Sequence, residues 1–237
     1  MEFLLSFLAA ILPSLLLLFV IVRNDKFPEP PEMIWKSFAK GIQIVIPIIL
    51  LALPISYVLE HSVLATMPVA LAFATAFLTA AIPEEFFKYL VLSRFSAQLE
   101  AFDEPMDALV YGAVASLGFA SFENILYVFE GGLETALLRA LTAVPAHASF
   151  GIIMGYFYAK KQFPSKKASY LSKALWIPIL LHGLYDSFLF IPANISVLYS
   201  NDALIPESEK WIMILSLGSV ICCFIYTVRM AFSQAKE

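Results

Sequence analysis

Charged residues are scarce in this sequence. They make up 14% of its 237 residues, whereas 60% are hydrophobic, and the mean hydropathy is +0.82. So little polar surface cannot cover a water-soluble globule of this length, which excludes a soluble enzyme or a soluble binding domain. The 15 basic and 19 acidic residues leave a net charge of −4, which favours neither nucleic acid nor an acidic protein as a partner. The composition therefore predicts an integral membrane protein that lies in a lipid bilayer.

Cysteine is rare in this sequence, and two familiar catalytic signatures are absent. The only cysteines, Cys222 and Cys223, are neighbours in an apolar run and point in different directions on a helix, so no structural disulfide is expected. The zinc-protease signature H-E-x-x-H and the serine-hydrolase elbow G-x-S-x-G are both absent. The architectures of those two soluble hydrolase classes are thereby excluded.

Long apolar runs are abundant instead. About 20 apolar residues cross ~30 Å of hydrocarbon at a rise of 1.5 Å per residue. Seven runs reach that length, at about Phe3–Val22, Ser37–Leu59, Val63–Phe95, Met106–Phe129, Thr135–Ala159, Leu171–Ala193 and Trp211–Phe232. The first lacks a basic n-region and a cleavage site, which indicates a retained span and not a signal peptide. The third contains Pro83 and is too long for a perpendicular span, so we expect it to be tilted, kinked at the proline or broken into two helices.

Basic residues alternate between the connecting segments. One side of the predicted bundle carries 12 of them: Arg23, Lys26, Lys36, Lys40, Arg94, Lys160, Lys161, Lys166, Lys167, Lys173, Arg229 and Lys236. The other side carries Arg139 and Lys210, so the positive-inside rule places the amino terminus outside and the carboxyl terminus in the cytoplasm. We predict an all-α fold, a polytopic transmembrane helix bundle of about seven spans. It forms a single transmembrane domain over residues 1–237, with its motif-bearing core at about 63–193.

Two carboxylates and an ammonium interrupt the third run, at Glu84, Glu85 and Lys88. Each charge at bilayer depth costs ~2.5–3.5 kcal/mol, so such residues indicate a functional site. Lys88 follows Glu84 by four residues and Glu85 by three, so either acid can pair with it on one helix face. A packing salt bridge would explain one pair, but one lysine cannot neutralise both acids, and the surplus acid requires a metal or a proton. Adjacent helical residues differ in direction by ~100°, and the spacing leaves open which acid faces the rest of the site.

Two of the three histidines, His147 and His182, lie deep in separate predicted spans. A single buried histidine is usually structural, whereas two of them with intramembrane acids favour metal ligation. Asp186 is one turn after His182 and can either ligate the same ion or orient the imidazole. The helical rise, counted from the span ends, places Glu85, His147 and His182 near one level, ~13–18 Å into the bilayer.

The fourth span adds an acid, Glu123, followed by the amide Asn124 and, one turn later, by Tyr127. The Tyr127 hydroxyl can donate to the Glu123 carboxylate, and a polar contact between helices is the structural alternative for Glu123. Counted from Met106, Glu123 comes out ~25 Å deep and therefore toward the outer leaflet, away from the histidines. At this depth Glu123 would not share a site with Glu85, His147 and His182.

Two histidines, a glutamate and a neighbouring carboxylate form the composition expected for catalytic zinc, which commonly takes three protein ligands and a water. The predicted ligands are Glu123, His147, His182 and Asp186. Glu84 or Glu85 suits the general base that takes a proton from the metal-activated water as it attacks a carbonyl. Lys88 holds the unused carboxylate ionised or stabilises an oxyanion, and Asn124 and Tyr127 support the ligands from behind.

Four motifs in separate predicted spans resemble those of one known family. They are Glu84-Glu85-Phe86-Phe87-Lys88, Phe119-Ala-Ser-Phe-Glu123-Asn124, His147 and His182-Gly-Leu-Tyr-Asp186. In this order they are similar to the motifs of the PrsW family of intramembrane proteases, within the wider group of CAAX prenyl endopeptidases and bacteriocin-immunity proteins. The motifs cover about the central half of the chain.

That resemblance implies peptide-bond hydrolysis in or near the bilayer. The family's best-known role is the first cut in a membrane-spanning anti-sigma factor, which releases a transcriptional stress response. The prenyl endopeptidases carry a histidine where this chain has Glu123, which disfavours a CAAX-type substrate. The resemblance leaves open whether the reaction uses a metal-activated water or a glutamate alone, and the ligand set favours the metal.

The sequence thus predicts a zinc-dependent intramembrane endopeptidase of the bacterial plasma membrane whose partner is a membrane-spanning protein substrate. Two other classes stay open. A proton-coupled transporter also uses buried acids, lysine and histidines, although no repeated half with paired broken helices is evident. A non-enzymatic scaffold would use the polar residues only to pack its helices. The substrate, the cleavage site, the regulation and the oligomeric state are not fixed by the sequence.

Overall fold

The computed structural model describes residues 2–163, 169–199 and 204–235. Its α-helices are α1 (Glu2–Arg23), α2 (Pro31–Gln43), α3 (Val45–Glu60), α4 (Pro68–Thr75), α5 (Ile82–Leu90), α6 (Pro105–Leu141), α7 (Ala143–Gln162), α8 (Ser169–Leu198) and α9 (Glu207–Gln234). Short 3-10 and π segments are η1 (Val63–Thr66), η2 (Ala76–Ala81), η3 (Val91–Phe95) and η4 (Ser96–Gln98). No strand occurs in the described ranges, which confirms the all-α class.

Six described segments are long and apolar enough to cross a membrane: Leu4–Arg23, Pro31–Glu60, Pro68–Gln98, Pro105–Gln162, Tyr170–Leu198 and Glu207–Ser233. The chain is therefore a polytopic integral membrane protein, as predicted. The segment Pro105–Gln162 is 58 residues long and contains both the fourth and the fifth predicted spans. The total of seven crossings and the orientation of the termini stay predictions.

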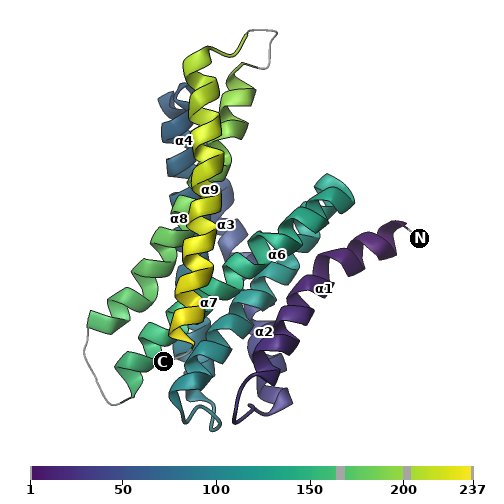
Figure 1. The fold of residues 1–237 in the computed structure, drawn as a ribbon, viewed down its shortest axis with the longest axis vertical. Coiled ribbons are helices and arrows are strands. Elements are labelled where there is room, and N and C mark those ends of the chain that lie inside the picture. Colours follow the sequence, from purple (N-terminus) through teal and green to yellow (C-terminus); the bar gives the residue numbers. More distant parts are fainter. Residues whose placement is uncertain (1, 164–168, 200–203, 236–237) are drawn as a thin grey trace.

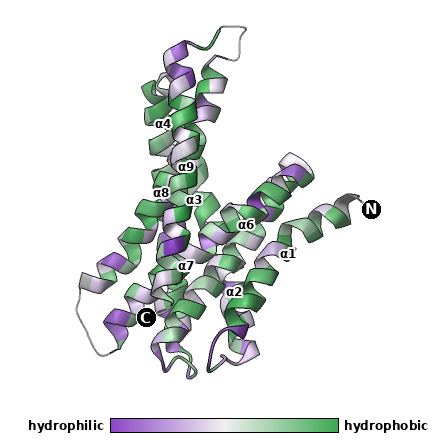
Figure 2. Ribbon diagram, viewed as in Figure 1, coloured by the Kyte–Doolittle hydropathy of each residue, from purple (hydrophilic) through white to green (hydrophobic). Residues whose placement is uncertain are grey.

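The exterior of the bundle is apolar, as a lipid-facing surface requires. Large side chains such as Leu50 and Leu215 are 67% and 68% exposed, although each lies in the middle of a helix. Figure 2 shows hydrophobic residues along the whole length of most helices, with hydrophilic residues gathered mainly near helix ends and in the loops. In water this surface would be costly, whereas hydrocarbon accommodates it without penalty.

Helices α6 and α7 form the centre of the molecule, with α1 and α2 packed on one side and α8 and α9 on the other (Figure 1). Their backbones touch, because a Cβ atom on Gly112 would lie 2.3 Å from the carbonyl oxygen of Gly151. One turn away, a Cβ atom on Gly155 would lie 2.1 Å from the carbonyl oxygen of Ala108. These small residues allow the close antiparallel approach typical of membrane helices, as their spacing predicts.

The helix α6 is not straight. Gly132 has φ 72° and ψ −165°, a conformation almost restricted to glycine, and the chain turns back there. Arg139 and Glu123 are 16 residues apart and would be ~24 Å apart on a straight helix, yet their side chains form an ion pair. The turn lies within the connection expected between the fourth and fifth spans, and a second break follows at Thr142.

The third predicted span is broken at Met67, and from Pro68 on it is a continuous helical segment whose hydrogen-bond pattern changes along its length. The α-helix α4 passes into the π-helical turn η2, and α5 begins directly after it with Pro83 in its first turn. Proline lacks an N–H donor and its ring crowds the preceding turn, and a wider π turn relieves both conditions. The distortion expected at Pro83 is thus a π-helical turn, which ends at Ala81, with Ile82 and Pro83 between it and the paired acids.

Candidate active site

The helix α5 turns its three charged residues toward the interior. Glu84 is 5% exposed, Glu85 is fully buried and Lys88 is 1% exposed. The Lys88 Nζ atom lies 3.2 Å from Glu84 Oε2 and 2.8 Å from Glu85 Oε1, so the one ammonium pairs with both carboxylates. The pairing expected from the three- and four-residue spacing is present for both acids.

The helices α7 and α8 bring the two histidines to this cluster. His147 Nδ1 lies 3.1 Å from Lys88 Nζ, and His182 Nδ1 lies 2.9 Å from Glu85 Oε1. The two imidazole rings are perpendicular, with their centroids 5.2 Å apart. His147 is the fifth residue of α7, whereas His182 lies in the middle of α8. Residues from three helices therefore meet at one buried point, as the depth of these residues predicted.

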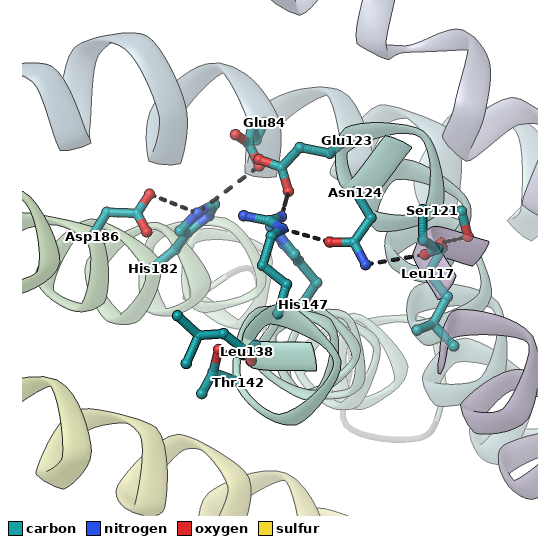
Figure 3. A network of polar contacts seen from close by, with 12 residues as sticks. Glu84, Leu117, Ser121, Glu123, Asn124, Leu138, Thr142, His147, His182 and Asp186 are labelled. Carbon is teal, nitrogen blue, oxygen red and sulfur yellow. Dashed lines mark hydrogen bonds and ion pairs between the residues drawn. The ribbon is translucent and has the colours of Figure 1, made fainter. Parts of the chain in front are cut away.

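Asp186 lies one turn after His182 on α8 and contacts it, as Figure 3 shows. The distance from Asp186 Oδ2 to His182 Nε2 is 3.1 Å, and Glu84 Oε2 lies 3.9 Å from the same nitrogen. A carboxylate can only accept a hydrogen bond, so Asp186 favours a proton on His182 Nε2. The contact suits an orienting role for Asp186.

Glu123 also belongs to the cluster. His147 Nε2 lies 3.0 Å from Glu123 Oε2, so the expectation that Glu123 is too far toward the outer leaflet is wrong. The helix α6 begins at Pro105, and counting depth from its start ignores how helices tilt and how far they extend beyond the bilayer. Next to Glu123, Asn124 Nδ2 donates to the carbonyl oxygen of Ala10 in α1, at 3.1 Å.

Arg139 is a site residue that the sequence analysis missed, since it was counted among the basic residues of a loop. Its Nη2 atom lies 2.5 Å from Glu123 Oε2 and its Nε atom lies 2.5 Å from Asn124 Oδ1. The Tyr127 ring lies under the guanidinium, 4.1 Å away, and a hydrogen bond from Tyr127 to Glu123 stays a prediction. Apolar residues flank Arg139 on both sides, and this pattern was the signal that could have identified it.

A cavity of about 460 Å³ opens beside these residues. Its polar lining residues include Glu84, Glu123, Arg139, His147, His182 and Asp186. Its apolar lining residues include Val45, Ile48 and Ile49 from α3, with Phe119 from α6. Glu84 thus faces the cavity, whereas Glu85 is fully buried between Lys88 and His182. The packing distinguishes the two acids, which the spacing alone left equivalent.

Four of the residues form a candidate metal site. Glu84, Glu85, His147 and His182 each offer a ligand atom, and these atoms all lie within 4.8 Å of one another. Carboxylate oxygen and imidazole nitrogen are ligands that zinc accepts. The second carboxylate oxygen of Glu85, Oε2, is buried without a hydrogen-bond partner. The donor types, the spacing and this unpaired oxygen fit a bound cation.

The comparison with known proteins decides the family. A family model described as PrsW family intramembrane metalloprotease matches residues 29–218. This chain belongs to the PrsW family. The match covers every motif residue from Glu84 to Asp186, so it confirms the resemblance that those motifs carried.

Several curated relatives in this family are bacterial proteins named Protease PrsW. The one from Geobacillus kaustophilus is 40% identical over 183 residues, which cover 76% of this chain and 78% of the relative. The one from Oceanobacillus iheyensis is 42% identical over 76% of this chain and 81% of its own length. The one from Bacillus subtilis is 39% identical over 78% of this chain and 83% of its own length. No solved structure matches the chain significantly.

Membership of the PrsW family supports an intramembrane protease over the transporter and scaffold hypotheses. The same membership and the apolar helices establish an integral membrane protein with bacterial relatives.

Proposed function

We propose that this protein is a zinc-dependent intramembrane endopeptidase that hydrolyses a peptide bond of a membrane-spanning protein. The observation that carries this proposal is the group of four side chains able to bind a metal, Glu84, Glu85, His147 and His182, beside a cavity lined by both polar and apolar residues. The family supports the reaction class, because it is described as a metalloprotease family.

In this proposal Glu85, His147 and His182 hold the zinc ion. A zinc ion bound there supplies Lewis-acid polarisation of the scissile carbonyl and of the attacking water. Glu85 is suited to a ligand because it is fully buried and does not face the substrate cavity. Asp186 accepts a hydrogen bond from His182 Nε2, which leaves Nδ1 on the side of Glu85. Glu123 and Asp186, both predicted as ligands, serve here to orient the two histidines.

Glu84 is the general base. Its carboxylate faces the cavity, where it takes a proton from the attacking water and returns it to the leaving amine. The Lys88 ammonium lies 3.2 Å from Glu84 Oε2 and fixes the position of this carboxylate beside the cavity. Val45, Ile48 and Phe119 also line the cavity, and such apolar side chains lower the dielectric constant around the polar groups.

The substrate is a transmembrane segment of another protein, such as an anti-sigma factor. Its cleavage yields two polypeptides and releases a transcriptional stress response. An extended peptide places apolar side chains against the α3 wall and its carbonyl groups toward Glu84 and His182. This substrate class comes from the family resemblance, together with the position of the site within apolar helices.

The experiment uses the purified full-length protein in lipid nanodiscs, with an anti-sigma factor containing its transmembrane segment as the probe. We expect cleavage that 1,10-phenanthroline abolishes and that stoichiometric zinc restores, and we expect His182→Ala to be inactive. Full cleavage in the chelated protein would overturn the metal-dependent mechanism. Full cleavage by His182→Ala would overturn the proposed site. Proton flux without cleavage would point to the transporter hypothesis instead.

A further inference from the structure

Arg139 connects two arms of α6 at the edge of the site. Its side chain is 14% exposed, and its partner Glu123 is 17% exposed, so the pair is largely removed from solvent. The turn at Gly132 brings Arg139 back to Glu123 across 16 residues. A buried ion pair is costly to break, because the remaining charge is left without compensation. The pair therefore fixes where the Glu123 carboxylate lies.

The contacts of His147 define which of its nitrogens carries the proton. Lys88 Nζ, which can only donate, lies 3.1 Å from His147 Nδ1, so Nδ1 is the acceptor. Glu123 Oε2, which can only accept as a carboxylate, lies 3.0 Å from His147 Nε2, so Nε2 carries the proton. Both neighbours select the same neutral tautomer, in which the Nδ1 lone pair points toward Lys88, the partner of Glu84 and Glu85.

Glu123 can hold this tautomer only while it stays ionised and in place. Arg139 provides both conditions, since its fork of donors binds Glu123 through Nη2 and Asn124 through Nε. Asn124 is in turn tied to the backbone of α1 at Ala10, and the Tyr127 ring supports the guanidinium from one face. A lysine has no such fork, so it can replace only part of the arrangement.

We propose that Arg139 is a positioning residue that holds Glu123 away from the metal and on the Nε2 side of His147, so that His147 presents Nδ1 to the metal site. This inference rests on the proposed function for its metal, but the arrangement of Arg139, Glu123 and His147 is independent of catalysis. It assigns Glu123 to the support of a ligand, in place of the ligand role expected from the sequence.

The direct test is the tautomer of His147, measured by ¹⁵N NMR of full-length protein labelled on histidine, of which the chain has three. We expect the proton on Nε2 in the unsubstituted protein. Arg139→Gln weakens one of the two contacts that select this tautomer and leaves the contact of Lys88, so we expect a minor fraction protonated on Nδ1 in that variant. Arg229→Gln, which removes an exposed guanidinium on α9, is the matched control and should keep the Nε2 proton. A proton on Nδ1 in the unsubstituted protein would overturn the inference.

The second test is metal affinity. Supporting contacts of this kind contribute about tenfold to a hundredfold in affinity, so Arg139→Gln should weaken zinc binding by that factor in equilibrium dialysis. Arg139→Lys should recover part of the loss, and Arg229→Gln should bind zinc as the unsubstituted protein does. Unchanged zinc affinity in Arg139→Gln would contradict the proposal. If Arg139→Gln does not fold, the NMR of the unsubstituted protein and the cobalt spectrum below decide.

Cobalt substitution separates a ligand from a supporting residue. With Co²⁺ in the site, Glu123→Gln should weaken binding but leave the positions of the visible absorption bands unchanged, because the atoms bonded to the metal stay the same. A large shift of these bands would show that Glu123 is a ligand and would overturn the inference. A protein that binds metal with the expected tautomer but never cleaves the probe would overturn the proposed function and leave the role of Arg139 standing.

Discussion

The Nζ atom of Lys88 lies 3.1 Å from Nδ1 of His147, and it also contacts Glu84 and Glu85. The ammonium thus touches three of the four residues of the candidate metal site. An ammonium and a divalent cation repel each other at such distances, so we expect the two to compete for these donors. We predict that the Lys88 ammonium moves off His147 Nδ1 and stays beside Glu84 when a metal binds.

Replacing Lys88 tests this competition. We expect Lys88→Met to bind zinc about tenfold or more tightly, because no ammonium has to be displaced. In the absence of metal the same variant should be less stable by about 3–5 kcal/mol, since buried carboxylates lose their counter-charge. Equilibrium dialysis and thermal unfolding with and without zinc measure the two effects. Weaker zinc binding by Lys88→Met would show that the lysine supports the metal and does not compete with it.

The two adjacent glutamates should fail in different ways. Glu84 faces the cavity, so Glu84→Gln should keep its zinc and lose cleavage by about a hundredfold or more. Glu85 is buried against His182 and Lys88, so Glu85→Gln should lose zinc affinity as well as cleavage. Metal content and cleavage rate, measured on the same preparations, distinguish the outcomes. The assignment is wrong if the metal is lost in Glu84→Gln and retained in Glu85→Gln.

Gly132 should be intolerant of a side chain. At φ 72° and ψ −165° a Cβ atom is strained even though nothing lies within 4 Å of it, and we expect Gly132→Ala to lower stability by about 1–3 kcal/mol. Cleavage should also fall, because the turn sets Arg139 against Glu123. The control is Gly218→Ala in α9, where a Cβ atom also meets nothing within 4 Å, and alanine there should be neutral or stabilising. Thermal unfolding and cleavage assays of the two variants check the prediction. A Gly132→Ala variant as stable as Gly218→Ala would refute it.

From the burial of Glu29 we predict that the folding stability of the protein depends on pH. It lies in the segment between α1 and α2, buried against α6, and the Tyr111 hydroxyl donates to its carboxylate. Burial raises the pKa of Glu29 from 4.5 to about 7; the hydrogen bond from Tyr111 opposes this rise, and the negative charges of Asp107 and Asp25 add to it. Between these two values the folded protein binds more protons than the unfolded chain does, so stability falls as pH rises and levels off above about 7.

Glu29→Gln should remove this fall. We expect the variant to be more stable than the unsubstituted protein at about pH 8 and to change little between about pH 5 and pH 8. Glu100→Gln, at an exposed position in the same half of the chain, is the control and should retain the fall. Chemical or thermal unfolding across this pH range measures the difference. A Glu29→Gln variant with the original pH dependence would show that another group titrates.

Much of the candidate site could be predicted because many of its residues lie within a few positions of one another in the sequence. The apolar runs identify a membrane protein, and charges inside those runs stand out because the bilayer makes them costly. The pairing of Glu84 and Glu85 with Lys88, and of His182 with Asp186, follows from the period of the α-helix alone. The chain order of these motifs was also enough to indicate the PrsW family.

Only the tertiary structure decided how these parts face one another. His147 reaches Lys88 across 59 residues and His182 reaches Glu85 across 97, and no local period specifies such contacts. Arg139 appeared to be a loop residue, because the turn at Gly132 and its consequence for Glu123 depend on how α6 folds back. The helix period determines in which direction each side chain points relative to its neighbours within about a turn. The packing of the helices determines their tilt and the depth and exposure of each side chain. For that reason the sequence by itself determined which charged residues and histidines lie inside apolar spans, and the fold alone added Arg139 to the candidate site and distinguished the acid in the cavity from the acid buried behind it.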